Sequence, residues 1–423
     1  MARRRDHGHA GLTRPLGRRS FLRAAAVGTV SASALGAVLD ACTRSSGTAT
    51  SGGGSEPIAS GLPIERDATL RVYEWKDYLA SRVLDAFTRR HAAANVRIHV
   101  ESFQRIDEAI AHLARPDAAF DVFFPTIDVL PGLIAAGTLR PLNHDYLSNV
   151  RNLWSWFNGA ARPSYDPGLG YTVPYTVYSS GVGWRDDLVA PADAPDERDP
   201  FAILWDARYH GRLGVYDEYL EGLSLALLRE GVADLKVATD DQLARAADAL
   251  DEAVRVAGLR FTLDGAEEGL PEGEFVAHQS WSGDVLTAPR YAEEDHPGSG
   301  ARVARQLRYR APSAPGLVVG CDLTAICARG RNPVLAHAFL NHLLDFDTAM
   351  DNFAWNGYQP PLTGVTADAF ADPSFRWHAA VPPNLRNAII SEDAFAGGQM
   401  LVGFGPSEQA RWLDQWNRVV PRT

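Results

Sequence analysis

From residue 67 onward, short strand-like runs alternate with short helical segments, and this alternation limits the fold more than any other feature of the chain. The first run, Leu70–Tyr78, opens with β-favouring apolar residues and ends in aromatic ones. Helical periodicity follows between Ser81 and His91, and Val96–Glu101 then alternates apolar and polar residues as a half-buried strand does. Strands that alternate with helices are typical of a mostly parallel sheet covered by helices. The sequence therefore predicts an α/β fold.

Two longer strand-rich runs, Tyr171–Trp184 and Leu317–Cys327, indicate two passages of the chain between separate lobes. The body of the chain, about 360 residues, is too long for one ordinary hydrophobic core and is typical of two lobes. Two passages would build each lobe from two pieces of chain. The expected division is 67–175 plus 320–385 for lobe 1 and 176–319 plus 386–423 for lobe 2.

The N-terminal segment has the features of an export signal. Residues 1–23 carry seven arginines and end in Gly17–Arg23, which reads GRRSFLR and has the shape of a twin-arginine signal. The apolar run Ala24–Leu39 that follows is too short and too rich in small residues to be a convincing membrane span. We therefore expect export by the twin-arginine route.

A possible lipid attachment site follows directly. Leu39-Asp40-Ala41-Cys42 resembles a lipoprotein cleavage box, in which Cys42 would be acylated, although Asp40 is an uncommon residue there. The alternative is ordinary cleavage that leaves a free Cys42. The next residues, 43–60, are mostly Ser, Gly and Thr, as in a flexible linker. The expected organisation is a signal peptide over 1–41 and a tether over 42–66, which would hold the body outside the cytoplasm at the membrane by a lipid anchor.

Charge and cysteine content exclude several classes of protein. The full chain has a formal net charge of −11, and the seven arginines and two aspartates of 1–41 leave −16 on the rest. A body this acidic argues against nucleic acid as a partner. Cys321 and Cys327 lie in one strand-like run and would be about 20 Å apart, too far for a disulfide. No metal-ligand spacing and no cofactor motif are present, so we expect neither a metal nor a cofactor.

The end of the first strand carries residues suited to a cation. Trp75 and Tyr78 flank Lys76 and Asp77 where the strand ends, and ligands of α/β sheets bind beyond the carboxyl ends of strands. An aromatic ring beside a carboxylate suits an alkyl cation, because both attract positive charge. The alternative is an aromatic strand end that packs in a core.

A second candidate pair follows the strand-like run Leu213–Tyr216. Glu218 and Glu221 are three residues apart, so both carboxylates would share one face of a first helical turn. The simpler interpretation is that they complement the helix dipole.

Two later segments predict helix starts. Thr239-Asp240-Asp241-Gln242 has the pattern of a capping box, and Asn332-Pro333 is expected to cap a further helix. In that further helix, His337 and His342 are more typical of packing than of ligands.

Seven stretches occur along the chain in the order LRVYEWKDYLASRVLDAF, DVFFPTIDVL, VPYTVYSSGVGW, GRLGVYDEYLEGLSLALL, EGEFVAHQSWSGD, LTAICARGRNPVLAHAFLNHLL and NGYQPP. Together they resemble the spermidine/putrescine-binding proteins of bacterial ABC importers, a branch of the extracellular solute-binding proteins. The resemblance covers the chain from about Asp67 to its end.

This resemblance implies a two-lobed periplasmic-binding-protein fold of type II-like form, in which each lobe has a mixed, mostly parallel sheet flanked by helices and hinge strands join the lobes. It also implies a polyamine site in the cleft between them and no enzymatic activity. Trp281 would stack on the alkyl chain, Asp322 would hold an inner amine, and Gln399 would contact a terminal amine. The full implied set is Trp75, Asp77, Tyr78, Thr126, Asp128, Glu218, Glu221, Trp281, Asp322, Tyr358 and Gln399.

Several positions depart from the pattern of that family. Asp128 stands where a tyrosine is usual, Gly320 stands where a stacking tryptophan is expected, and Glu218 stands where aspartate is usual. Lys76 would repel a polyamine if it pointed into the cleft. Because neighbouring residues at a strand end face opposite ways, we expect Lys76 to point to solvent.

The expected partners are a small cationic solute, an ABC permease with its ATPase, and the membrane only through a lipid on Cys42; the protein is expected to be a monomer. Two alternatives remain. One is the same transport role for another solute, such as a sugar, an amino-acid derivative, thiamine or a metal chelate. The other is a secreted hydrolase that uses Glu218 and Glu221 as an acid–base pair, although the chain has no nucleophile elbow, zinc motif or phosphate loop.

Overall fold

A computed structural model of the chain describes residues 56–158, 163, 165–402 and 404–420. Within these residues, one mixed sheet of ten strands runs through the molecule, with helices packed around it. The main strand order is β2-β1-β3-β10-β5-β8-β6-β7, while β4 pairs with β10 and β9 with β5. The expected signal peptide and Cys42 lie outside the described residues.

The first half of the sheet shows the predicted strand–helix alternation. Strand β1 (Thr69–Trp75) lies between β2 (Arg97–Phe103) and β3 (Val122–Phe123), and all three are parallel. Helices α3 (Ser81–Arg90) and α4 (Ile106–Ala114) each follow a strand. Each helix has an apolar face that packs on the core, and α4 carries two carboxylates in its first turn, as the helix dipole favours. We call this half the first lobe.

The second half repeats the pattern and forms the second lobe. Strand β6 (Leu213–Tyr216) is parallel to β7 (Arg260–Thr262) and β8 (Ala277–Trp281), and helices α7 (Tyr219–Arg229) and α8 (Asp240–Ala257) cover it. The predicted capping box at the start of α8 is present. Apart from two long strands described next and several short helical turns, the other strands and helices are β4 (Leu139–Arg140), α5 (Leu130–Ala135), α6 (Ser155–Asn158), α9 (Leu270–Glu272), α10 (Ser282–Asp295), α11 (Gly300–Gln306), β9 (Leu307–Arg310), α12 (Pro333–Leu343), α13 (Phe346–Asn356), α14 (Ala367–Ala371), α15 (Glu392–Gly397) and α16 (Pro406–Val419).

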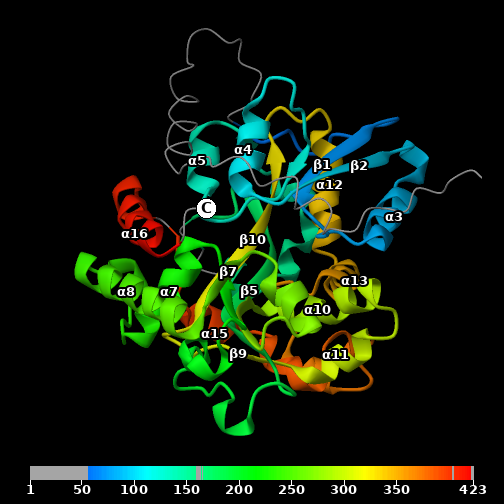
Figure 1. Cartoon of the computed structure of the whole chain (residues 1–423). Helices are drawn as coiled ribbons and strands as arrows, with labels where there is room; N and C mark the ends of the chain where they lie inside the picture. Colours follow the sequence, from blue (N-terminus) through cyan, green and yellow to red (C-terminus); the bar gives the residue numbers. More distant parts are fainter. Residues whose placement is uncertain (1–55, 159–162, 164, 403, 421–423) are drawn as a thin grey trace, which may run out of the picture.

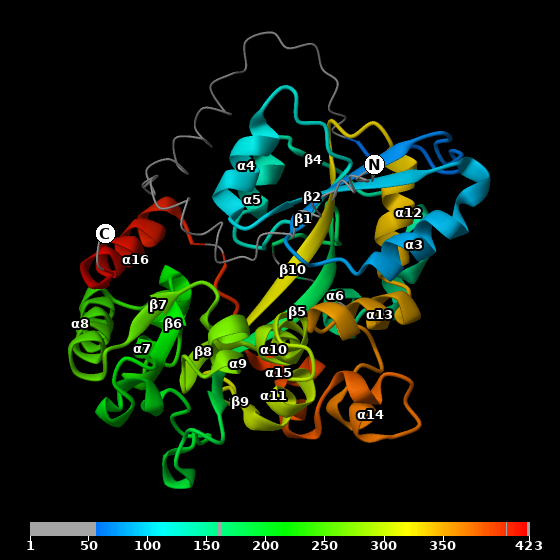
Figure 2. The same cartoon turned by 45° about the vertical axis from the view of Figure 1, so that its right-hand side comes forward.

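Two long antiparallel strands join the lobes. Strands β5 (Thr172–Arg185) and β10 (Val318–Cys327) pair from Ser180 opposite Val318 to Thr172 opposite Ala325. Figures 1 and 2 show them side by side, running from the first lobe to the second. They coincide with the two strand-rich passages predicted from the sequence. Because both strands are almost entirely buried, the residues at their centre are held firmly between two hydrophobic cores.

The start of helix α12 differs from the sequence-based expectation. The helix begins at Pro333 as predicted, but the Asn332 side chain does not cap it. The carboxylate of Glu65 does so, because it accepts hydrogen bonds from the backbone nitrogens of Val334 at 3.1 Å and Leu335 at 2.7 Å. A residue far away in the sequence thus accepts hydrogen bonds from the free backbone N–H groups at the helix N-terminus.

Part of the segment expected to be a tether packs on the first lobe. The hydroxyl of Tyr146 donates to the carbonyl of Ala59 at 2.8 Å, and the amide of Asn143 donates to the carbonyl of Ile58 at 2.8 Å. Together with Glu65, these contacts hold residues 58–66 against the body, so this part of the expected tether differs from a free linker.

The residues assigned to packing are buried in the structure. Cys321 and Cys327 are free and buried, and His337 and His342 lie in the core face of α12. The His342 Nε2 atom is hydrogen-bonded to the carbonyl of Val83 at 3.0 Å. None of the helices in the described part of the chain is long and apolar enough to cross a membrane.

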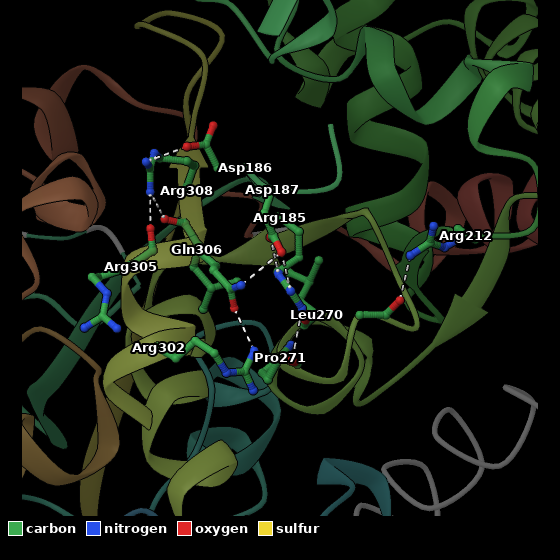
Figure 3. Close-up of polar contacts among 12 residues, drawn as sticks. Arg185, Asp186, Asp187, Arg212, Leu270, Pro271, Arg302, Arg305, Gln306 and Arg308 are labelled. Atoms are coloured by element: carbon green, nitrogen blue, oxygen red, sulfur yellow. Dashed lines mark hydrogen bonds and ion pairs between the residues drawn. The ribbon is translucent and has the colours of Figure 1, made fainter. Parts of the chain in front are cut away.

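A buried arginine fixes the second-lobe end of β5. The Arg185 guanidinium donates to both carboxylate oxygens of Asp187 at 2.8 Å and to the carbonyls of Leu270 and Pro271 at 3.1 Å (Figure 3). These bonds tie the crossing strand to α9 and the turn beside it. The position of β5 in the second lobe therefore depends on a buried charge that makes four hydrogen bonds.

We expect Arg185→Leu to lower the free energy of unfolding by about 2–4 kcal/mol, because Asp187 and two carbonyls lose their donor. Arg212→Leu is the matched control. Arg212 also donates to a backbone carbonyl, that of Gly273 at 2.8 Å (Figure 3). Because Arg212 is exposed, its loss is expected to cost less than about 0.5 kcal/mol. Urea denaturation measures both, and equal losses would contradict the anchoring role of Arg185.

Candidate functional site

The crossing strand β10 places a buried carboxylate between the lobes. Asp322 lies beside a register shift in the β10–β5 pairing and is 7% exposed. The hydroxyl of Tyr78, in the loop after β1, donates to Asp322 Oδ2, and the Thr176 hydroxyl on β5 lies 3.4 Å from the same atom. The Tyr78 and Thr176 hydroxyl oxygens are 2.9 Å apart. Three distant segments thus converge on one carboxylate.

A second buried carboxylate, Asp284, was not singled out from the sequence. It lies in the first turn of α10 and accepts hydrogen bonds from the hydroxyls of Tyr216 and Tyr358, the latter at 2.5 Å. Its sequence signal is its place three residues after Trp281, at the start of the helix that follows β8. That is the edge at which parallel strands present ligand-binding groups.

The third buried carboxylate, Glu221, is surrounded by neutral donors. Its oxygens accept hydrogen bonds from the Ser180 hydroxyl at 2.6 Å, the Gln279 amide at 2.7 Å and the Trp281 indole N–H at 2.8 Å. The indole bond fixes the direction of the Trp281 ring, and the Tyr216 ring stacks on it with centroids 4.2 Å apart.

Five aromatic rings surround these carboxylates. The Tyr78 and Tyr358 centroids are 5.4 Å apart, and Tyr178 lies 5.7 Å from Trp281 and 6.1 Å from Tyr358. We call the three acids and five rings the central cluster. Its members are Glu221, Asp284, Asp322, Tyr78, Tyr178, Tyr216, Trp281 and Tyr358.

Two further carboxylates border the central cluster. Glu218 is the N-cap of α7 and accepts hydrogen bonds from the backbone nitrogens of Leu220 at 2.9 Å and Glu221 at 3.2 Å. This is the helix-terminus role that the sequence allowed. Burial and then the charge of Glu221 raise the pKa of Glu218 to about 8, and the charge of Asp128 raises it further. Asp128 keeps an exposed side chain, yet the protein around it raises its pKa.

Burial disfavours the charged forms of these five carboxylates, and repulsion between some of them adds to this effect. Burial raises the pKa of Asp322 to about 6, and the charges of Asp128 and Asp284 act in the same direction. Burial likewise raises the pKa of Asp284 to about 6. None of the ion pairs among the described residues involves Asp128, Glu218 or any acid of the central cluster. The site therefore has unneutralised negative potential, which favours a cation.

Gln399 is not brought to the central cluster. Its side-chain oxygen accepts from the backbone nitrogen of Leu235 at 2.8 Å, and its amide nitrogen donates to the carbonyls of Ala233 at 2.9 Å and Pro315 at 2.6 Å. These bonds join the segment between α15 and α16 to the loop after α7 and to the turn before β10. All its polar atoms are thus engaged by backbone groups.

Trp75 and Asp77, at the end of β1, are not members of the central cluster. The half-buried Trp75 ring packs on Phe103 with centroids 4.6 Å apart, and its indole N–H is buried without a partner among the described residues. Asp77 has a left-handed backbone, with φ of 59°, and its charge acts on the buried Glu74. Lys76 is exposed, and the expectation that it points away from the cleft stays a prediction.

Thr126 approaches the site through its backbone. It forms an isolated antiparallel bridge with Asp322, and its hydroxyl is buried without a hydrogen-bond partner in the described part of the chain.

Among the described residues, no group of three or more His, Cys, Asp or Glu side chains is placed to hold a metal ion. Acids separated by aromatic rings are instead suited to an organic cation.

These raised pKa values predict a pH-dependent stability. A carboxyl whose pKa rises on folding stabilises the fold below its unfolded pKa of about 4, and this contribution is lost as the pH rises through the folded pKa. For Asp322, with a folded pKa of about 6, the loss between pH 4 and pH 8 is about 2 kcal/mol. Between pH 4 and pH 8, the ligand-free, unmodified protein should lose about 2 kcal/mol more free energy of unfolding than the Asp322→Asn variant.

Urea denaturation at pH 4, 6 and 8 measures this difference. Asp414→Asn, on an exposed position of α16, serves as the control and should not change the pH profile. The same pH dependence in Asp322→Asn and in the unmodified protein would contradict the assignment of the titration to Asp322.

Comparison with known proteins yields a family and several relatives. The family model for bacterial extracellular solute-binding proteins matches residues 83–380. The chain is 28% identical over 322 residues to the putrescine/cadaverine-binding protein of Pseudomonas aeruginosa, a match that covers 74% of this chain and 85% of that protein. It is 24% identical over 372 residues to the spermidine/putrescine-binding periplasmic protein 1 of Haemophilus influenzae, which covers 86% of this chain and 93% of that protein.

Solved structures share the fold. The spermidine/putrescine substrate-binding protein PotD of Streptococcus pneumoniae superposes with a TM-score of 0.65 at 19% identity, covering 84% of this chain and 98% of that chain. The Tp0655 lipoprotein of Treponema pallidum also gives a TM-score of 0.65 at 19% identity, covering 83% and 99%. The predicted two-lobed periplasmic-binding-protein fold is confirmed. The chain belongs to the bacterial extracellular solute-binding proteins, which are not enzymes, so the hydrolase alternative is set aside.

Proposed function

We propose that this protein is the substrate-binding protein of an ABC importer and that it captures a small organic cation of the polyamine class. The observation that carries the proposal is the central cluster, in which three buried acids, bordered by Glu218 and Asp128, lie among aromatic rings with no ion-pairing cation among the described residues. The putrescine and spermidine named in the descriptions of the relatives support the same class of ligand.

A polyamine fits this arrangement for a physical reason. Each ammonium group is strongly hydrated, and its burial is tolerated only when a carboxylate or several acceptors replace the water. The methylenes between the ammonium groups need apolar cover, which ring faces supply together with cation–π attraction of about 0.5–2 kcal/mol each. Asp322 and Asp284 would pair with ammonium groups, while the Trp281 and Tyr358 rings would cover the chain between them.

The tyrosine hydroxyls would set the positions of the acids. Tyr78 donates to Asp322, while Tyr216 and Tyr358 donate to Asp284. Each carboxylate is thereby oriented before the ligand arrives, which lowers the cost of ordering side chains on binding. A bound cation would relieve the repulsion among the acids and return their pKa values toward the ordinary range.

Transport completes the proposal. The lobes, 67–175 plus 320–385 and 176–319 plus 386–423, would close on the ligand about β5 and β10 and present it to a membrane permease driven by a cytoplasmic ATPase. Export would follow the twin-arginine signal of 1–41, and a lipid on Cys42 would hold the protein, as a monomer, at the outer face of the membrane. The family, whose members are extracellular, supports this placement.

We expect calorimetric titration to give micromolar or tighter binding of putrescine or spermidine. Asp322→Asn and Trp281→Ala should each weaken that binding at least about tenfold, because one removes a paired charge and the other a covering ring. Trp377→Ala is the matched control, because Trp377 is also half-buried but packs against Phe346 and Phe375.

No binding of either polyamine by the folded protein would overturn the polyamine assignment. Maltotriose and glutamate, titrated in parallel, test whether a neutral or an anionic solute binds instead.

A further inference from the structure

Tyr178 and Gly320 face each other across the two crossing strands. They are direct partners in the β5–β10 register. A Cβ atom added to Gly320 would lie 2.2 Å from Cζ, 2.3 Å from the hydroxyl oxygen and 2.6 Å from Cε2 of Tyr178. The Tyr178 ring therefore lies across the open face of Gly320 and occupies the space that a side chain there would need.

The ring extends into the central cluster. Its centroid is 5.7 Å from that of Trp281 and 6.1 Å from that of Tyr358. After burial, the charges of Asp322 and Glu221 are the largest influences that raise the pKa of Tyr178. The residue thus stands among the acids and rings that would contact a cation, although no motif in the sequence marked it.

The Tyr178 hydroxyl differs from those of the neighbouring tyrosines. Tyr78, Tyr216 and Tyr358 each donate to a carboxylate, whereas the Tyr178 hydroxyl has no hydrogen-bond partner among the described residues and its side chain is only half-buried. Its oxygen is available to accept a hydrogen bond from a ligand, and its ring face can cover methylenes.

We propose that Tyr178 is a specificity-determining ligand contact of this site, and that Gly320 is the glycine that makes room for its ring. The proposal rests on the proposed cation-binding function and adds a residue to it. The ring would cover the alkyl chain of the cation and the hydroxyl would accept from an ammonium group. The aromatic wall expected at position 320 is then supplied from the opposite strand, so Gly320 leaves no gap.

This pairing has a consequence that a merely exposed tyrosine would not have. A methyl group at position 320 must displace the Tyr178 ring, so Gly320→Ala should weaken ligand binding through Tyr178. When Tyr178 is already alanine, the same methyl group has nothing to displace. The two substitutions should therefore be strongly non-additive.

The test is calorimetric titration of putrescine and spermidine into the unmodified protein, Tyr178→Ala, Tyr178→Phe, Gly320→Ala and the double variant Tyr178→Ala/Gly320→Ala. We expect Tyr178→Ala and Gly320→Ala each to weaken binding about tenfold or more. The double variant should bind the polyamine no more weakly than Tyr178→Ala does. Tyr178→Phe should lose only the part of the affinity that the hydroxyl contributes.

Two glycine variants are controls. Gly397→Ala places its Cβ at an ordinary 3.5 Å from Ala314 and should be neutral. Gly183 lies on the same strand as Tyr178, and a Cβ atom added there would lie 2.8 Å from Ser280 and 2.9 Å from Val285. These contacts do not involve the Tyr178 ring. Gly183→Ala should therefore lower the unfolding temperature, and its effect should add to that of Tyr178→Ala. Thermal unfolding of every variant separates loss of fold from loss of binding.

The outcomes separate this inference from the function on which it rests. If the unmodified protein binds a polyamine and Tyr178→Ala binds within about twofold of it, or if the two substitutions are additive, the role of Tyr178 is overturned while the function stands. If the folded, unmodified protein binds neither polyamine, the proposed function fails and the inference fails with it.

Discussion

Burial of the carboxylates that the fold gathers between its lobes, together with the repulsion among them, is the constraint on which this structure depends. Unpaired charges in a protein interior are costly, and here the cost appears as pKa values of about 6 for Asp284 and Asp322 and about 8 for Glu218. Hydroxyls from Tyr78, Tyr216 and Tyr358 reduce the cost without neutralising the charge. Under the proposed function, a site built in this way holds its acids ready for a cation from solution.

The crossing strands make this arrangement possible. Strand β10 carries Asp322, and β5 carries Thr176, Tyr178 and Ser180, which reach the central cluster within five residues of chain. Arg185 fixes β5 where it enters the second lobe. Because both strands belong to one continuous sheet, a movement of the lobes would have to bend these strands, which also carry residues of the proposed ligand site.

Much of the fold follows from patterns that local physics determines. The strand–helix alternation, the two long passages and the capping box of α8 were readable because each depends on residues close in sequence. Asp322, Trp281 and Tyr358 were likewise predicted through a resemblance, and the structure brings them together.

Features that depend on distant partners could not be predicted from the sequence. Glu65 replaces Asn332 as the cap of α12, and Gln399 is engaged by Ala233, Leu235 and Pro315, because tertiary contacts decide which side chain reaches an open backbone group. Asp284 and Tyr178 were missed for the same reason. Their roles appear only when Tyr216, Tyr358 and the open face of Gly320 are placed beside them.

A crystal structure of the protein grown with putrescine tests the central claim most directly. The account predicts one diamine among the rings of the central cluster, with its nitrogen atoms within hydrogen-bond distance of Asp322 and of Asp284 or Glu221, and with its methylenes against Trp281 and Tyr178. A diamine bound elsewhere, or a central cluster that holds only water at saturating putrescine, would contradict it.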